Sequence, residues 1–243
     1  CKNLAQFSVS PDNEFFKAKE DGCLYTVDDV LVCYLAGKTG EATFEEGVTF
    51  AAQAFYGCDE LTSISIPEGI TEIPDYMFEE MTNLKSVTLP NTLTKIGKYA
   101  FRYSGLETLE VPGSVETIDN YAFRDCANLT EVTFAEGLKT IGDYVFTDTP
   151  IQKLVLPASM ESIGAIFSLS KNFALTEFTL TGGNPTFKTY VLRDCINLKK
   201  VTLPDSLTSI SDYMFYGCTA LTQIKLPGKL ETIGAGAFRE TGV

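Results

Sequence analysis

The stretch CINLKKVTLPDSLTSISDYMF, residues 195–215, decides the fold, because most of the chain repeats it. Val201 and Leu203 lie two residues apart, so on a strand their side chains point to the same face. Pro204 then ends the hydrogen-bonded ladder, since proline lacks an N–H group and has a fixed φ. The first half of this stretch therefore predicts a short strand with one apolar face.

The second half of the stretch predicts a turn that packs back onto the core. Ser211 and Asp212 are residue types that cap a short helical turn, and Phe215 follows them as an aromatic anchor. The strand-opening position recurs every 22 to 24 residues, at Leu61, Leu84, Leu106, Leu129, Ile151, Leu175, Leu198 and Leu221. The anchor position recurs at Phe55, Phe78, Phe101, Phe123, Phe146, Phe167, Leu192, Phe215 and Phe238.

These copies predict a repeat solenoid. One copy cannot bury its own apolar side chains, but stacked copies share a continuous apolar core. We therefore expect one elongated domain over residues 1–243. Within it, an irregular repeat with a hairpin insertion occupies residues 1–57, and an array of about 23-residue repeats occupies residues 58–243.

The motif C-x-x-L-x-x-V-x-L-P-x-x-L-x-x-I-x-x-x-x-F resembles the BspA-like leucine-rich repeats of bacterial surface proteins, and copies of it cover most of the chain beyond residue 57. The resemblance implies an α/β-class solenoid that winds as a right-handed superhelix. It implies a parallel β-sheet on one side, with short helical turns and loops on the other. It also implies a secreted or cell-surface protein of the adhesin type.

Residues 1–57 depart from the repeat and predict a β-hairpin. Two β-rich runs, residues 21–27 and 30–35, flank the dipeptide Asp28-Asp29. A two-residue turn there pairs Leu24 with Cys33, which places the thiols of Cys23 and Cys33 on opposite faces, so we predict no disulfide between them. We expect this hairpin to pack against the side of the solenoid and act as a structural brace. The alternative is that it projects as a finger that recognises a partner.

Composition excludes several classes of function. The net charge of −13 disfavours nucleic acids and anionic membrane surfaces as partners. No apolar run approaches the roughly 20 residues of a membrane helix. The chain contains no histidine, which removes Ser-His-Asp and Cys-His catalysis and His-ligated zinc, and we expect no cofactor. It shows no signal peptide, but residue 1 already lies inside a repeat, so we expect the natural N-terminus to be missing.

Two further columns of residues recur three positions after and two positions before the anchor. The first holds Cys58, Cys126, Cys195 and Cys218, which we interpret as buried thiols that pack as small apolar side chains. The second holds Tyr76, Tyr99, Tyr121, Tyr144, Tyr190 and Tyr213. We expect these tyrosines to stack with their hydroxyl groups in solvent, and glycan binding by them is the alternative.

The outward positions of the strands form the candidate binding site, because solenoids use this wide face for partners. These candidate residues are Thr88, Glu110, Thr133, Thr179 and Thr202. The alternative site is the irregular loop at Gly182, Gly183 and Asn184, which we interpret as part of a decayed repeat that bends the solenoid.

We expect a non-enzymatic binding or adhesion module, acting as a monomer on an extracellular protein or a neutral glycan. One alternative is a glycosidase that uses two carboxylates about 5–10 Å apart. The other is a structural spacer within a larger surface protein.

Overall fold

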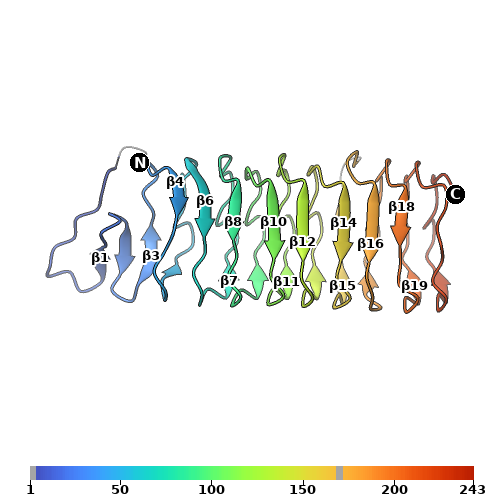
Figure 1. Ribbon diagram of the computed structural model, residues 1–243, viewed down its shortest axis with the longest axis horizontal. Coiled ribbons are helices and arrows are strands. Elements are labelled where there is room, and N and C mark those ends of the chain that lie inside the picture. Colours follow the sequence, from blue (N-terminus) through green and yellow to red (C-terminus); the bar gives the residue numbers. More distant parts are fainter. Residues whose placement is uncertain (1–3, 168–171) are drawn as a thin grey trace.

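The computed structural model describes residues 4–167 and 172–243 and shows an elongated solenoid whose strands lie across its long axis (Figure 1). The coils follow one another along that axis in sequence order, with the N-terminal strands at one end. Among the described residues, no helix has the length and apolar character needed to cross a membrane.

A broad parallel sheet carries one strand from each copy of the motif between Leu61 and Leu198, and β4 adds a strand before them; among the described residues, the last copy, at Leu221, forms no strand in it. Its hydrogen-bonded groups, β4-β6-β8, β10-β12 and β14-β16-β18, lie side by side along the solenoid. The strands are β4 (Gly40–Ala42), β6 (Leu61–Ser65), β8 (Ser86–Thr88), β10 (Thr108–Val111), β12 (Glu131–Phe134), β14 (Lys153–Leu156), β16 (Glu177–Leu180) and β18 (Lys200–Thr202). Equivalent positions of the motif pair with each other, as in Leu109 with Val132, so the predicted parallel register is confirmed.

A second, narrower parallel sheet was not predicted. Its strands are two residues long and follow the broad sheet in each coil, at the isoleucine position of the motif; that position holds Phe187 in β17, and its side chain is buried except at Ile233 of β20. They are β7 (Glu72–Ile73), β9 (Lys95–Ile96), β11 (Thr117–Ile118), β13 (Thr140–Ile141), β15 (Ser162–Ile163), β17 (Thr186–Phe187), β19 (Ser209–Ile210) and β20 (Thr232–Ile233). Strands β7 to β17 form one six-stranded sheet, and β19 pairs with β20.

The short helical turns expected on the other side are absent from the described residues, which contain no helix. The tyrosine position has a positive φ in every coil that holds it, 63° at Tyr76 and 56° at Tyr99, and this breaks a right-handed helix. Alternate N–H groups also point to the next coil: the N–H of Phe78 donates to the carbonyl of Ala100 at 2.8 Å. The segment from the tyrosine position to two residues after the anchor, such as residues 76–80, is therefore a turn that is hydrogen-bonded to the same turn of the next coil. We call this series of turns the turn ladder.

The core is built from columns of identical side chains. The strand-opening leucines, such as Leu84 and Leu129, are fully buried. The anchor phenylalanines stack, with ring centroids 5.4 Å apart for Phe101 and Phe123 and 5.7 Å apart for Phe123 and Phe146. Each coil therefore buries its apolar face against copies of itself, as the repeat pattern requires.

The N-terminal hairpin is confirmed, with a different turn. It consists of β2 (Leu24–Thr26) and β3 (Val30–Cys33), and it gains an antiparallel strand β1 (Phe16–Ala18) and a parallel strand β5 (Thr49–Phe50). Three residues, not two, form the loop, and Asp29 takes a φ of 63°.

A bulge follows the hairpin turn. Tyr25 pairs with Leu31, whereas Leu24 pairs with Cys33 as predicted, so one strand carries an extra residue between these pairs. Cys23 is buried and Cys33 is half-buried, and both are free thiols, in agreement with the prediction that they form no disulfide.

Candidate functional site

The outward positions of the broad sheet bring the five candidate residues into one row. Glu110 pairs with Thr133 across β10 and β12, and Thr179 pairs with Thr202 across β16 and β18. Thr88, Glu110, Thr133 and Thr202 are exposed, whereas Thr179 is half-buried.

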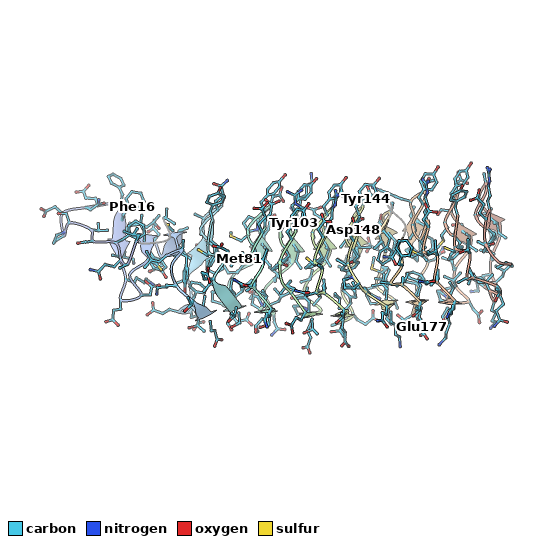
Figure 2. All side chains as sticks on the ribbon, turned by 90° about the horizontal axis from the view of Figure 1, so that it is seen from above. Phe16, Met81, Tyr103, Tyr144, Asp148 and Glu177 are labelled. Carbon is cyan, nitrogen blue, oxygen red and sulfur yellow. The ribbon has the colours of Figure 1, made fainter. Side chains whose placement is uncertain are left out.

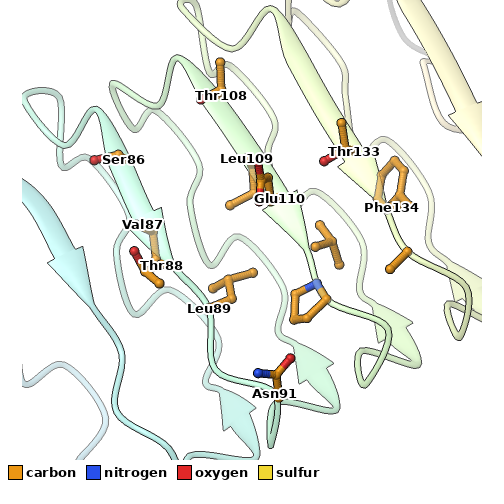
Figure 3. Close-up of a pocket in the computed structure, with 13 residues that line it drawn as sticks. Ser86, Val87, Thr88, Leu89, Asn91, Thr108, Leu109, Glu110, Thr133 and Phe134 are labelled. Carbon is orange, nitrogen blue, oxygen red and sulfur yellow. The ribbon is translucent and has the colours of Figure 1, made fainter.

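Three of the five residues meet in one hollow. Thr88, Glu110 and Thr133 line an open hollow of about 540 Å³ that crosses three strands (Figure 3). A second hollow of about 580 Å³ continues over β12 and β14 and includes Lys153. Thr179 and Thr202 line neither hollow and lie further along the same sheet.

Phe134 is a residue of this face that the sequence reasoning missed. It occupies an inward position that holds the buried residues Val111 and Leu156 in the neighbouring coils, yet it is half-buried and lines both hollows. Its ring lies 6.5 Å from that of Phe146 in an edge-to-face arrangement. The signal was present in the sequence, because Ala135 replaces the usual proline immediately after it.

Charges on this face alternate in sign along the solenoid. Lys153 pairs with Glu177, and Glu177 with Lys200, at equivalent strand positions. The Lys200 and Glu177 side chains are 3.6 Å apart, and both are substantially exposed, so this ion pair contributes little stability. The alternating charges of β14, β16 and β18 therefore remain available to a partner.

The tyrosine column stacks as predicted. Ring centroids lie 5.0 Å apart for Tyr76 and Tyr99, 4.8 Å for Tyr99 and Tyr121, and 5.1 Å for Tyr121 and Tyr144. Figure 2 shows Tyr144 and Glu177, a residue of the broad sheet, on opposite sides of the solenoid. Stacking uses the ring faces that a sugar would need, so the column offers a ligand mainly its edges.

The cysteine column packs in the core. Cys126 and Cys218 are fully buried free thiols, and the Cys126 thiol donates to the carbonyl of Phe101 at 3.0 Å. Burial raises the pKa of both thiols to about 12, so they are unreactive at neutral pH. Within residues 4–167 and 172–243, no group of His, Cys, Asp and Glu residues is arranged to hold a metal ion.

The alternative loop site is occupied by contacts within the protein. The Asn184 side-chain oxygen accepts a hydrogen bond from the N–H of Thr208 at 3.0 Å, and the Gly183 carbonyl accepts one from the Ser206 hydroxyl. A Cβ atom at Gly182 would lie 2.7 Å from the Cβ of Ala158. These glycines allow close packing of neighbouring coils, which favours a structural role for the loop.

Comparison with known proteins identifies the repeats. The model of the BspA type leucine rich repeat region matches residues 48–174 and 165–243, with 6 copies. No curated protein matches the chain. Among solved structures, the T. pallidum leucine rich repeat protein is 24% identical and has a TM-score of 0.55, over 95% of this chain and 88% of that one.

The pneumococcal vaccine antigen PcpA is 21% identical, with a TM-score of 0.51 over 91% of this chain and 78% of that one. At these identities, both structures support the fold alone. The family model carries the assignment, because it covers most of the chain. This protein therefore belongs to the BspA type leucine-rich repeat family.

Proposed function

We propose that the chain is a binding module of a secreted or cell-surface protein, which holds a macromolecule on its broad sheet and does not transform it. Leucine-rich repeats of this type are typical of bacterial surface proteins, which supports the location. One observation carries the proposal: two adjoining hollows share Thr133 and Phe134 and extend across four neighbouring strands.

The chemistry of this face fits a protein or a neutral glycan. Rows of threonine hydroxyl groups donate and accept hydrogen bonds, while Phe134 supplies a partly exposed aromatic surface among them. The alternating charges of β14, β16 and β18 would fix the register of a complementary partner. A standard interface buries about 800 Å² on each partner, which a row of several strands can supply.

A glycosidase needs two carboxyl groups that face one bound sugar. The carboxylates that line the hollows, Glu110 and Glu131, lie on the neighbouring strands β10 and β12 but in different hollows, and both are exposed and not enclosed around one site. This arrangement favours binding over hydrolysis. A structural spacer would need no occupant on this face, so ligand binding separates that alternative from ours.

The test begins with a ligand found by pull-down from extracellular matrix or on a glycan array. We expect the double variant Thr133→Arg/Thr179→Arg to fold but lose this ligand, because two long charged side chains would obstruct the sheet face. The matched control is Asn184→Ala in the loop, which should bind normally. Unchanged binding by a folded arginine variant would refute the sheet-face site, and turnover of a polysaccharide would refute the non-enzymatic function.

A further inference from the structure

All four arginines of the chain occupy one position, immediately after the anchor. Three of them place the guanidinium group over the tyrosine three residues earlier. The distance to the ring centroid is 4.7 Å for Arg102 over Tyr99, 5.7 Å for Arg124 over Tyr121, and 4.9 Å for Arg193 over Tyr190. The fourth, Arg239, lies 5.9 Å from the ring of Tyr216. The turn ladder thus repeatedly combines a tyrosine ring with a guanidinium group.

Each of these guanidinium groups also has a carboxylate partner. Arg124 contacts Asp125 at 3.1 Å, Arg193 contacts Asp194 at 3.0 Å, and Arg102 pairs with Glu79 of the preceding coil. The recurring unit is therefore a ring, a cation over its face and a carboxylate beside the cation. Such an arrangement combines cation–π attraction with an ion pair.

The unit at Tyr76 lacks its cation. The position after the anchor holds Glu79 instead of arginine, and Glu80 follows it. Tyr76 is also the first ring of the stack, because Gln53 fills the tyrosine position in the coil before. No lysine or arginine among the described residues lies over the ring of Tyr76, a residue that is 48% exposed.

A groove opens beside Tyr76. It has a volume of about 470 Å³, and its lining includes Tyr76, Tyr56, Glu79 and Glu80. Met81, labelled in Figure 2, lies at its wall, and Tyr56 is 86% exposed.

The turn ladder is interrupted where the groove opens. In the coil that contains Tyr76, the N–H groups of Phe78 and Glu80 donate to the carbonyls of Ala100 and Arg102 in the next coil, each at 2.8 Å. The equivalent N–H groups of Phe55 and Gly57 donate to no described residue.

We propose that this groove binds a basic side chain, preferentially an arginine, of a protein partner. The guanidinium group would lie over the exposed face of Tyr76 and beside the carboxylates of Glu79 and Glu80, as Arg102 lies over Tyr99 beside Glu79. The net charge of −13 favours a basic partner. The groove shares no lining residue with the two hollows of the broad sheet, so this inference is independent of the proposed function.

The four methionines of the chain provide the measurement. Met77 and Met81 line the groove, whereas Met160 and Met214 are buried in other coils. With the methionine methyl groups labelled for NMR, the full chain is titrated with a short glycine-serine peptide that contains one arginine. The control peptide carries citrulline, which has nearly the same shape without the charge. We expect saturable shifts of the Met77 and Met81 signals, with the Met160 and Met214 signals unchanged.

The citrulline peptide should bind at least about fivefold more weakly, and added salt should weaken the arginine peptide. Tyr76→Leu should reduce affinity for the arginine peptide by a similar factor, and Glu80→Gln by less. Tyr144→Leu is the matched control, because it also removes a tyrosine of the same stack but lies outside the groove. Unchanged Met160 and Met214 signals establish that each variant is folded.

Equal binding of the two peptides would overturn the proposal, as would the absence of shifts at tens of millimolar arginine peptide. A neutral oligosaccharide that shifts Met77 and Met81 when the arginine peptide does not would reassign the groove to sugars. Loss of arginine binding in Tyr144→Leu to the same extent as in Tyr76→Leu would show that the effect is not specific to the groove.

Discussion

Between β6 and β14, each coil is covered on both sides by a copy of itself, whereas the first coil is covered on one side by the antiparallel strands β1 to β3. The packing of aromatic rings differs accordingly. Phe101 and Phe123 stack with planes 12° apart, but Phe50 and Phe55 meet at 90°. In the array, the repeated motif places identical phenylalanine rings one above another. The N-terminal unit does not repeat the motif, and its rings meet mainly edge to face.

The same comparison explains where a partner can bind. Inside a regular column, a side chain is covered by its copies, so its apolar faces are already used. Surface becomes available where a copy departs from the motif, as at Phe134 followed by Ala135, and at Tyr76 preceded by Gln53. Both sites proposed above lie at such departures.

The largest expected effect comes from breaking a column in the array. Leu129 is fully buried, so Leu129→Asp would place an unpaired charge in the core and should cost several kcal/mol, about 4 or more. Thermal unfolding followed by circular dichroism measures this. The neighbouring Asn128→Asp, at an exposed position, should leave the melting temperature nearly unchanged. Equal melting temperatures for the two variants would contradict a shared core.

A smaller and more local effect is expected at the N-terminal unit. Phe44 contacts the rings of Tyr34 and Phe50, with centroids 6.0 and 4.9 Å away, and is half-buried. We expect Phe44→Ala to cost about 2 kcal/mol, less than truncation of a fully buried ring. Hydrogen exchange should accelerate in β1 to β3 and stay slow in β10 to β14. Uniform acceleration along the whole chain would show that the two regions unfold as one unit.

The sequence predicted the features that identical copies enforce: the leucine and phenylalanine columns, the parallel register and the stacked tyrosines. It did not predict the second sheet, because two-residue strands leave no alternating pattern within one copy. It also missed the left-handed backbone at the tyrosine position, since tyrosine does not signal positive φ. The sequence did contain a hint, because Gly236 occupies that same position in the last coil, with φ of 62°.

Of the candidate site, the sequence predicted which residues face outward, because alternation along a strand determines it. It could not predict that Thr88, Glu110 and Thr133 share a hollow while Thr179 and Thr202 do not. Phe134 lines both hollows, and how far its ring is exposed depends on the packing of neighbouring side chains, which the pattern of one strand does not determine.

A pair of glycines compares the array with the first coil directly. Gly57 and Gly217 hold the same motif position, with φ of 77° and 74°. Alanine at either position should cost about 1 kcal/mol for the left-handed backbone. A Cβ at Gly217 would also lie 2.3 Å from Oδ1 of Asp194, whereas nothing lies within 4 Å at Gly57. Chemical denaturation should therefore show Gly217→Ala as the less stable variant, and equal losses would contradict the tighter contact between coils in the array.

The smallest expected effect is the pH dependence of the hairpin. The Asp29 carboxylate forms ion pairs with the ammonium groups of Lys19 at 2.8 Å and Lys17 at 2.9 Å, and these contacts hold its pKa below the ordinary value of 3.8. A carboxyl group with a lowered pKa in the folded state contributes stability above its unfolded pKa. That contribution disappears as the pH falls through the folded value.

Asp29→Asn should therefore weaken the hairpin slightly at about pH 7, and the difference from wild type should diminish toward strongly acidic pH, as the wild-type carboxyl group becomes protonated. Amide NMR signals of β1 and β2 report the hairpin, and those of β10 and β12 serve as the control from the array. Lys19 also contacts Glu45 at 2.9 Å, so part of the attachment survives the substitution and keeps the effect small. An equal difference between wild type and variant at neutral and at strongly acidic pH would show that the charge of Asp29 does not brace the hairpin.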